Sequence, residues 1–138
     1  MSQFDRLTAV TDAMYLRAQQ SLRATLVKEA DLRRELDKLK THVANARLDQ
    51  AETLDQMQAI GADILWEGWV SKTRAHLNLE LAKVLAQKEM HISKVRKAFG
   101  KKTVSGKLAH HDAAQVAKRA QQTKLATAIE SAMWRKDQ

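Results

Sequence analysis

Nine basic side chains gather between Lys94 and Lys124, in a segment that holds one acid, Asp112. They are Lys94, Arg96, Lys97, Lys101, Lys102, Lys107, Lys118, Arg119 and Lys124. Basic and acidic residues balance in the rest of the chain, so this segment carries the whole formal charge of +8. Like charges one helical turn apart repel each other, by a few tenths of a kcal/mol per pair. The segment therefore predicts attraction to an acidic partner; a purely solubilising role is the simpler alternative.

The histidines and carboxylates offer little catalytic or metal-binding chemistry. His110 and His111 are adjacent, so on a helix they point about 100° apart and cannot grip one metal ion together. The other three, His42, His76 and His91, have no ligand-type neighbours at metal-binding spacing. The carboxylates lie among basic residues at helical spacing, where ion pairs are the ordinary interpretation. We expect no catalytic residue, no metal, no cofactor and no small-molecule substrate.

Two tryptophans, Trp66 and Trp69, lie three residues apart beside Ile64, Leu65 and Val70. On a helix their directions diverge by about 60°, so one can enter a narrow apolar seam while the other stays exposed. Exposed aromatic residues are typical of binding hot spots. Alternatively, both close the open end of a helical hairpin. A third tryptophan, Trp134, is either an anchor for the C-terminal segment or incidental.

The composition predicts long helices to carry these groups. Aromatic residues make up 4% of the 138 residues, proline and cysteine are absent, and there are four glycines. Such a composition is typical of long helices and coiled coils, and the lack of cysteine fits a reducing compartment. The N-terminus does not resemble a signal peptide, and no run of eighteen apolar residues occurs. We expect a cytoplasmic protein.

An apolar stripe predicts the first helix over residues 5–59. Its members recur about every 3.6 residues: Leu7, Val10, Met14, Ala18, Leu22, Leu26, Ala30, Leu36, Leu39, Val43, Ala46, Leu54 and Met57. The flanking positions carry mixed charges, as coiled coils do outside their seam. A helix of this length must pack against another long helix.

A turn is predicted at residues 60–64, because Gly61 suits the left-handed residue after a helix and Asp63 can cap the next one. The second helix is then expected over residues 65–99, antiparallel to the first. Its stripe comprises Trp66, Val70, Thr73, Leu77, Leu81, Val84, Ile92, Val95 and Phe99, with Lys88 as a polar interruption.

Gly100 and Gly106 predict a hinge or short loop over residues 100–106, since each costs a helix about 1 kcal/mol relative to alanine. A last helix is expected over residues 107–135, with a thin apolar stripe. Counted from the predicted turn, residue 116 lies opposite Leu7, and the rest extends past the first helix. The fold class is all-α: one domain, residues 1–138, formed by a long antiparallel two-helix coiled-coil hairpin with a C-terminal helical extension.

The whole pattern resembles the FliJ family of flagellar export proteins and the stalk proteins of related type III secretion systems. The residues that carry the resemblance are the aromatic pair opening the second helix, in "ILWEGWVSKTRAHLNLE", and the end of the basic alanine-rich helix, "AIESAMWRKDQ". The resemblance covers nearly the whole chain, but it is one of pattern and includes no diagnostic motif. The chain departs from the family at Lys72 and Thr73, where relatives continue the apolar stripe.

The resemblance implies a non-enzymatic stalk in bacterial flagellum biogenesis and protein export. Such proteins insert their paired termini into the ring of a hexameric export ATPase and bind the cytoplasmic region of an export gate protein. The nine basic residues, with Arg6, Arg17 and Arg23, would then face the ATPase, and Trp66 and Trp69 the gate. Export chaperones are further partners, and membrane association at the cytoplasmic face of the inner membrane is through partners only.

Two other functions remain open on the sequence. The basic segment could neutralise the phosphates of a nucleic acid, although it has one aromatic residue for stacking, Phe99, and few amides placed to read bases. The C-terminal helix could lie on a membrane surface, although its apolar face is mostly alanine. Duplex DNA binding at physiological salt would favour the first of these.

Overall fold

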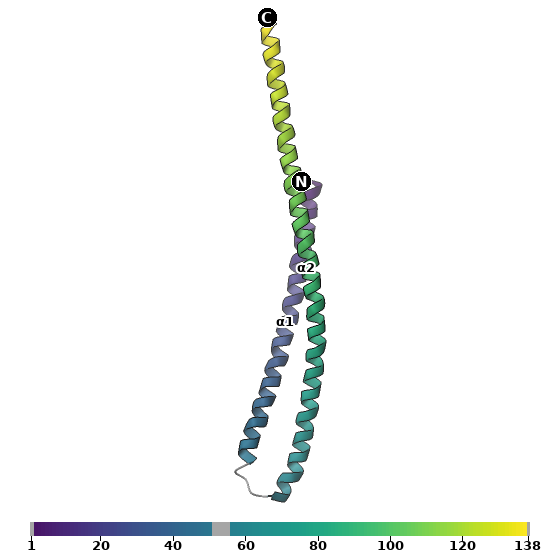
Figure 1. The fold of residues 1–138 in the computed structure, drawn as a ribbon, viewed down its shortest axis with the longest axis vertical. Coiled ribbons are helices and arrows are strands. Elements are labelled where there is room, and N and C mark those ends of the chain that lie inside the picture. Colours follow the sequence, from purple (N-terminus) through teal and green to yellow (C-terminus); the bar gives the residue numbers. More distant parts are fainter. Residues whose placement is uncertain (1, 51–55, 138) are drawn as a thin grey trace. The chain divides into compact units, whose positions relative to one another are not determined.

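The computed structural model describes residues 2–50 and 56–137, which form two α-helices. Helix α1 spans Gln3–Gln50 and helix α2 spans Gln56–Lys136 (Figure 1). No strand occurs within these two described ranges. The predicted all-α hairpin is therefore confirmed.

Helix α1 begins at a reciprocal cap. The backbone N–H of Asp5 donates to the hydroxyl oxygen of Ser2 at 3.1 Å, and the backbone N–H of Ser2 donates to the Asp5 carboxylate, also at 3.1 Å. These bonds satisfy backbone N–H groups that the first turn of a helix leaves without partners. The cap sets the start of α1 two residues before the predicted one.

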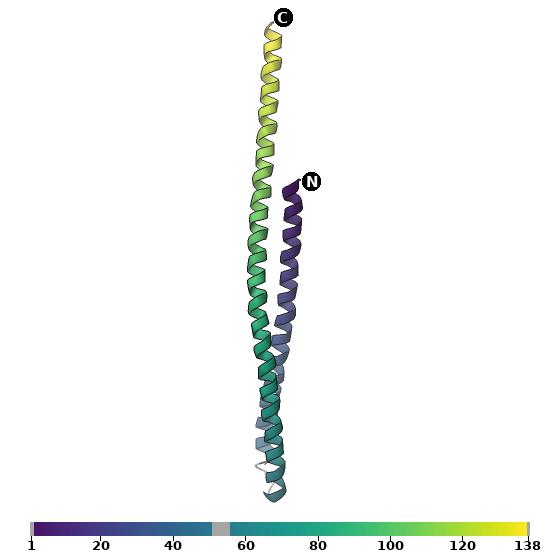
Figure 2. The same cartoon turned by 90° about the vertical axis from the view of Figure 1, so that its right-hand side faces the viewer.

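The chain divides into two units, each made of one segment of α1 and one of α2 (Figures 1 and 2). Unit 2 is Ala18–Lys94, and unit 1 is the part of the chain before and after it. The segments are antiparallel in each unit. In unit 1 the hydroxyl of Thr8 lies 3.4 Å from the Ser105 carbonyl oxygen, and the rings of Tyr15 and Phe99 lie 5.7 Å apart.

The apolar core of unit 2 joins both helices. Leu39 and Val43 of α1 are buried against Val70 and Leu77 of α2. Three partly buried side chains pack around this cluster: Leu32, Leu36 and Trp66. These residues belong to the regular part of the apolar pattern, because leucine and valine recur there at steps of three and four and can interlock across a two-helix seam.

The seam of α1 follows a stricter period than predicted. Most of its buried and half-buried positions alternate steps of four and three: Phe4, Thr8, Thr11, Tyr15, Ala18, Leu22, Thr25, Glu29, Leu32, Leu36, Leu39, Val43 and Ala46. The predicted stripe coincides with this seam at Ala18 and Leu22 and again from Leu36 to Ala46. Elsewhere the prediction is wrong, since Leu7, Val10, Met14 and Leu26 are exposed. A stripe of period 3.6 rotates slowly relative to a 3.5-residue seam, so the two coincide only in part.

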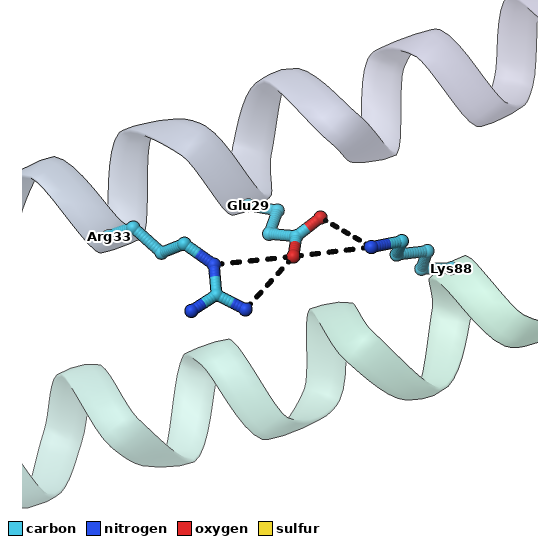
Figure 3. A network of polar contacts seen from close by, with 3 residues as sticks. All are labelled: Glu29, Arg33 and Lys88. Carbon is cyan, nitrogen blue, oxygen red and sulfur yellow. Dashed lines mark hydrogen bonds and ion pairs between the residues drawn. The ribbon is translucent and has the colours of Figure 1, made fainter.

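An ion-pair layer interrupts the seam of unit 2 (Figure 3). The Glu29 carboxylate accepts from Lys88 of the opposite helix, with Nζ 3.1 Å from Oε2 and 3.3 Å from Oε1. It also accepts from Arg33, one turn along α1, at 3.1 Å. Lys88 thus is the predicted polar interruption, and Glu29 is its partner. This layer favours one register, because sliding either helix would leave the Glu29 charge in the seam without Lys88.

We expect this layer to make the stability of unit 2 depend on pH. Hydrogen bonds from Lys88 and then Arg33 lower the pKa of the Glu29 carboxyl. A lowered acid pKa contributes stability above the ordinary glutamate value of about 4.3, and that stability is lost as pH falls through the folded-state value. Glu29→Gln should therefore lower the melting temperature at neutral pH, and its difference from the natural chain should shrink on acidification. Glu35→Gln, which removes an acid from an exposed site on the same helix, is the control and should leave the melting temperature at neutral pH nearly unchanged.

The predicted turn at 60–64 is wrong, because α2 already begins at Gln56 and runs through Gly61. No described glycine has a positive φ, so Gly61 is an ordinary helical residue. The leucine and valine contacts of the core and the Glu29–Lys88 ion pair stabilise this register of the two helices. Together they outweigh the cost of about 1 kcal/mol for a glycine inside a helix. Residues 51–55, which include Leu54 of the predicted stripe, lie outside the described residues.

The predicted hinge at 100–106 is also wrong, since α2 is continuous there. The helix ends at Lys136, one residue after the predicted end at 135. Extending an existing helix adds one hydrogen bond per residue, so two glycines are tolerated where starting a new helix would be costly. Leu7 lies beside Val104 and Leu108, not opposite residue 116. The unpaired part of α2 therefore begins earlier than predicted.

Candidate interaction surfaces

The basic segment lies along α2, and eight of its nine side chains are exposed. Lys94 is the last residue of unit 2, and the other eight belong to unit 1. Among the described residues, none of the nine forms an ion pair. The ion pairs that the structure contains there all involve other cations. A surface with so little internal neutralisation attracts anionic groups over a distance of about 10 Å at moderate salt.

Lys102 is the exception to this exposure. Its ammonium lies 4.9 Å from the centre of the Tyr15 ring, and Tyr15 in turn packs against Phe99 at an interplanar angle of 52°. A cation over an aromatic face is attracted by the electron density of the ring. Lys102 is therefore part of the contact between the helices of unit 1, and it is less available to an external partner than its exposed neighbours.

The C-terminal part of α2 extends beyond the start of α1 in unit 1 (Figures 1 and 2). Every described residue from Ala113 to Asp137 is exposed. We call residues 113–137 the extension. Its large apolar side chains all face solvent: Val116, Leu125, Ile129, Met133 and Trp134. The extension combines an uncovered apolar surface with a basic excess, so it fits an external partner better than a solubilising tail.

The tryptophan pair is divided as predicted. Trp66 packs against the core of unit 2, whereas Trp69 has 56% of its surface exposed. Leu65, one turn before Trp69, is exposed as well, and so is Ile64, five residues before it. The alternative in which both indoles close the hairpin is not observed. An exposed indole one turn from an exposed leucine is a candidate binding surface.

Unit 1 also carries an apolar groove that the sequence reasoning missed. Its walls are Leu7, Val10 and Met14 of α1 and Gly100, Val104 and Leu108 of α2; Thr11, Ser105, Lys97 and Lys101 complete the lining, around a volume of about 530 Å³. One feature of the sequence indicates this groove: the apolar stripe of α1 has a period of about 3.6 residues, whereas the seam has a period of 3.5. A strict heptad seam through Thr8 and Thr11 leaves the neighbouring leucine, valine and methionine outside.

No helix within residues 2–50 and 56–137 has a stretch both long and apolar enough for a membrane crossing. No group of three or more His, Asp or Glu side chains in the same ranges is arranged to hold a metal ion.

Comparisons with protein-family models, with curated proteins and with solved structures find no match to this chain.

Proposed function

We propose that this protein is a non-enzymatic stalk that couples two partners in a flagellar or related type III export apparatus. Its basic segment and extension bind the ring of a hexameric export ATPase. The surface around Trp69 binds the cytoplasmic region of the export gate protein. The protein itself works at the cytoplasmic face of the inner membrane, where these partners hold it.

The observation that carries this proposal is the uncompensated basic surface of unit 1. Seven exposed cations of the basic segment and the fully exposed extension belong to the α2 part of this unit, and no ion pair neutralises the basic segment among the described residues. A rod that works inside a ring needs attraction without deep interlocking, because it must contact several subunits in turn. Long-range charge attraction supplies this, since it depends only weakly on exact side-chain geometry.

The Trp69 surface supports the second half of the proposal. Trp66 packs against the core of unit 2, so Trp69 is presented on an anchored part of α2. Tryptophans in such positions dominate binding energies at protein interfaces. The two surfaces belong to different units, so one partner need not displace the other.

The test is binding to a purified hexameric export ATPase and stimulation of its ATP hydrolysis. The triple variant Lys107→Glu, Lys118→Glu, Lys124→Glu reverses three exposed charges and leaves Lys102 in place. We expect it to weaken ATPase binding by about tenfold or more and to abolish stimulation.

The control reverses three exposed lysines of unit 2, Lys38→Glu, Lys40→Glu and Lys72→Glu, with the same change in net charge. It should bind nearly as well as the natural chain. Equal losses in both variants would mean that net charge alone acts, and unaltered stimulation by the first variant would remove the stalk assignment. Tight binding to duplex DNA at about 0.15 M salt, lost in the first variant, would assign the basic surface to nucleic acid instead.

A further inference from the structure

The apolar groove of unit 1 is open along its length. Val10 and Val104, on facing walls, have 56% and 57% of their surfaces exposed. Gly100 contributes no side chain to the wall, and nothing lies within 4 Å of the place where a Cβ would be. The groove therefore has room for side chains from outside.

The groove exists because small and polar residues occupy the contact between the helices. Thr11, Ala98 and Ser105 are buried there. The Thr11 hydroxyl donates to the Thr8 carbonyl oxygen at 3.0 Å, so it needs no partner from the other helix. Two helices held together by threonine, serine and alanine bury little apolar surface. The larger apolar residues are thus left on one flank of the pair, where a third helix would cover them.

The rim of the groove is basic. Lys97 and Lys101 line it directly. On α1, Arg6 lies four residues before Val10 and Arg17 three residues after Met14, so helical periodicity places both on the groove side. Asp12 is two residues from both Val10 and Met14, and so points away from them by about 160°. On α2, Asp112 lies four residues after Leu108, so the same periodicity places one acid toward this end of the groove, against four cations. An occupant must therefore bring negative charge along with its apolar residues.

We propose that this groove binds an amphipathic α-helix of a partner protein, with an apolar stripe flanked by acidic residues, to form a three-helix coiled coil. Each wall spans about two helical turns, or about 10 Å, which matches apolar anchors at positions i, i+3 or i+4, and i+7 of the incoming helix. Glutamate or aspartate beside the stripe pairs with Lys97 and Lys101, as flanking charges do in coiled coils.

The chain's own extension does not fit this role. Among residues 113–137 it carries five basic residues, Lys118, Arg119, Lys124, Arg135 and Lys136, against Glu130 and Asp137. A basic helix would meet the basic rim and be repelled. Charge complementarity thus selects an acidic partner over a second copy of this chain. The inference goes beyond the stalk function and does not depend on which apparatus the protein serves.

The test uses a labelled designed peptide of about 21 residues with leucine and isoleucine on one face and glutamate on both flanks. Its binding to the full chain is followed by fluorescence anisotropy at about 0.15 M salt. The double variant Val10→Gln, Val104→Gln should weaken binding by about tenfold or more, and a peptide with lysine in place of glutamate should bind more weakly by a similar factor.

Val27→Gln is the matched control, because Val27 is equally exposed, at 59%, but lies in unit 2. It should leave peptide binding unchanged, and circular dichroism should show equal helix content in all variants. Absence of saturable binding, equal binding of both peptides, or binding insensitive to the double variant would overturn the proposal. A dimer of the full chain that the double variant dissociates would assign the groove to a second copy instead.

This test and the ATPase test can fail separately. The glutamine variants change no charge, and the lysines reversed in the ATPase experiment, Lys107, Lys118 and Lys124, do not line the groove. Loss of peptide binding in the double variant with intact ATPase stimulation would establish the groove as a separate surface. Loss of stimulation with intact peptide binding in the lysine variant would separate them in the other direction.

Discussion

Replacing Leu77 by alanine is expected to lower the free energy of unfolding by about 2–3 kcal/mol. Leu77 is 8% exposed and belongs to the four-residue cluster that joins α1 to α2 in unit 2. Alanine forms helices at least as well as leucine, so the loss would come from packing and not from helix propensity. The value lies at the low end for leucine-to-alanine changes because a two-helix seam can partly close around the gap. Urea unfolding followed by circular dichroism measures it.

Leu79 supplies the matched control two residues away. Its side chain is 56% exposed, and Leu79→Ala should change the free energy of unfolding by less than about 0.5 kcal/mol. The two variants remove the same atoms from the same helix, so their difference isolates burial. Similar effects at both positions would contradict the described seam.

The tryptophan pair should separate stability from binding. Trp66→Ala removes a ring that packs against the core, and we expect it to cost about 1–3 kcal/mol of stability. Trp69→Ala removes an exposed ring and should leave the unfolding curve nearly unchanged. If the proposed function holds, the order should reverse in binding to the export gate region, with a loss of about 30-fold for Trp69→Ala, as for a hot-spot residue worth about 2 kcal/mol.

Both tryptophan variants need one added measurement each. Binding of Trp66→Ala is determined well below its melting temperature, so that unfolding does not imitate a binding defect. Trp69→Phe serves as the conservative variant and should recover part of the affinity, because an exposed aromatic ring remains at this position. Gate binding by Trp69→Ala at the natural strength would exclude this surface.

The sequence predicted the all-α class and the different burial of Trp66 and Trp69, because both follow from helical periodicity. It also identified Lys88 as an interruption of the apolar stripe, but not its partner. Glu29 lies 59 residues away, and choosing it among the acids of α1 requires the register of the hairpin. That register follows from the sum of many small contacts across the seam.

The register in unit 1 was harder still to predict. Leu7, Val10 and Met14 form a good apolar stripe, whereas the true contact uses Thr8, Thr11 and Tyr15. A sequence pattern favours burial of the most apolar residues. Here the seam positions of α1 keep the same heptad spacing in unit 1 as in unit 2. That spacing determines which face of α1 contacts α2. The turn and the hinge predicted from the glycines were wrong for a similar reason. Gly61, Gly100 and Gly106 lie inside a helix that is long enough to tolerate them.

We propose that one molecule holds two partners at once, through the basic surface of unit 1 and the Trp69 surface of unit 2. Calorimetric titration of the gate protein's cytoplasmic region into the chain already saturated with hexameric export ATPase tests this proposal. We expect a ternary complex with nearly unchanged gate affinity, in which reversal of Lys107, Lys118 and Lys124 removes only the ATPase and Trp69→Ala removes only the gate region. Mutually exclusive binding of the two partners, or loss of both through either set of changes, would contradict it.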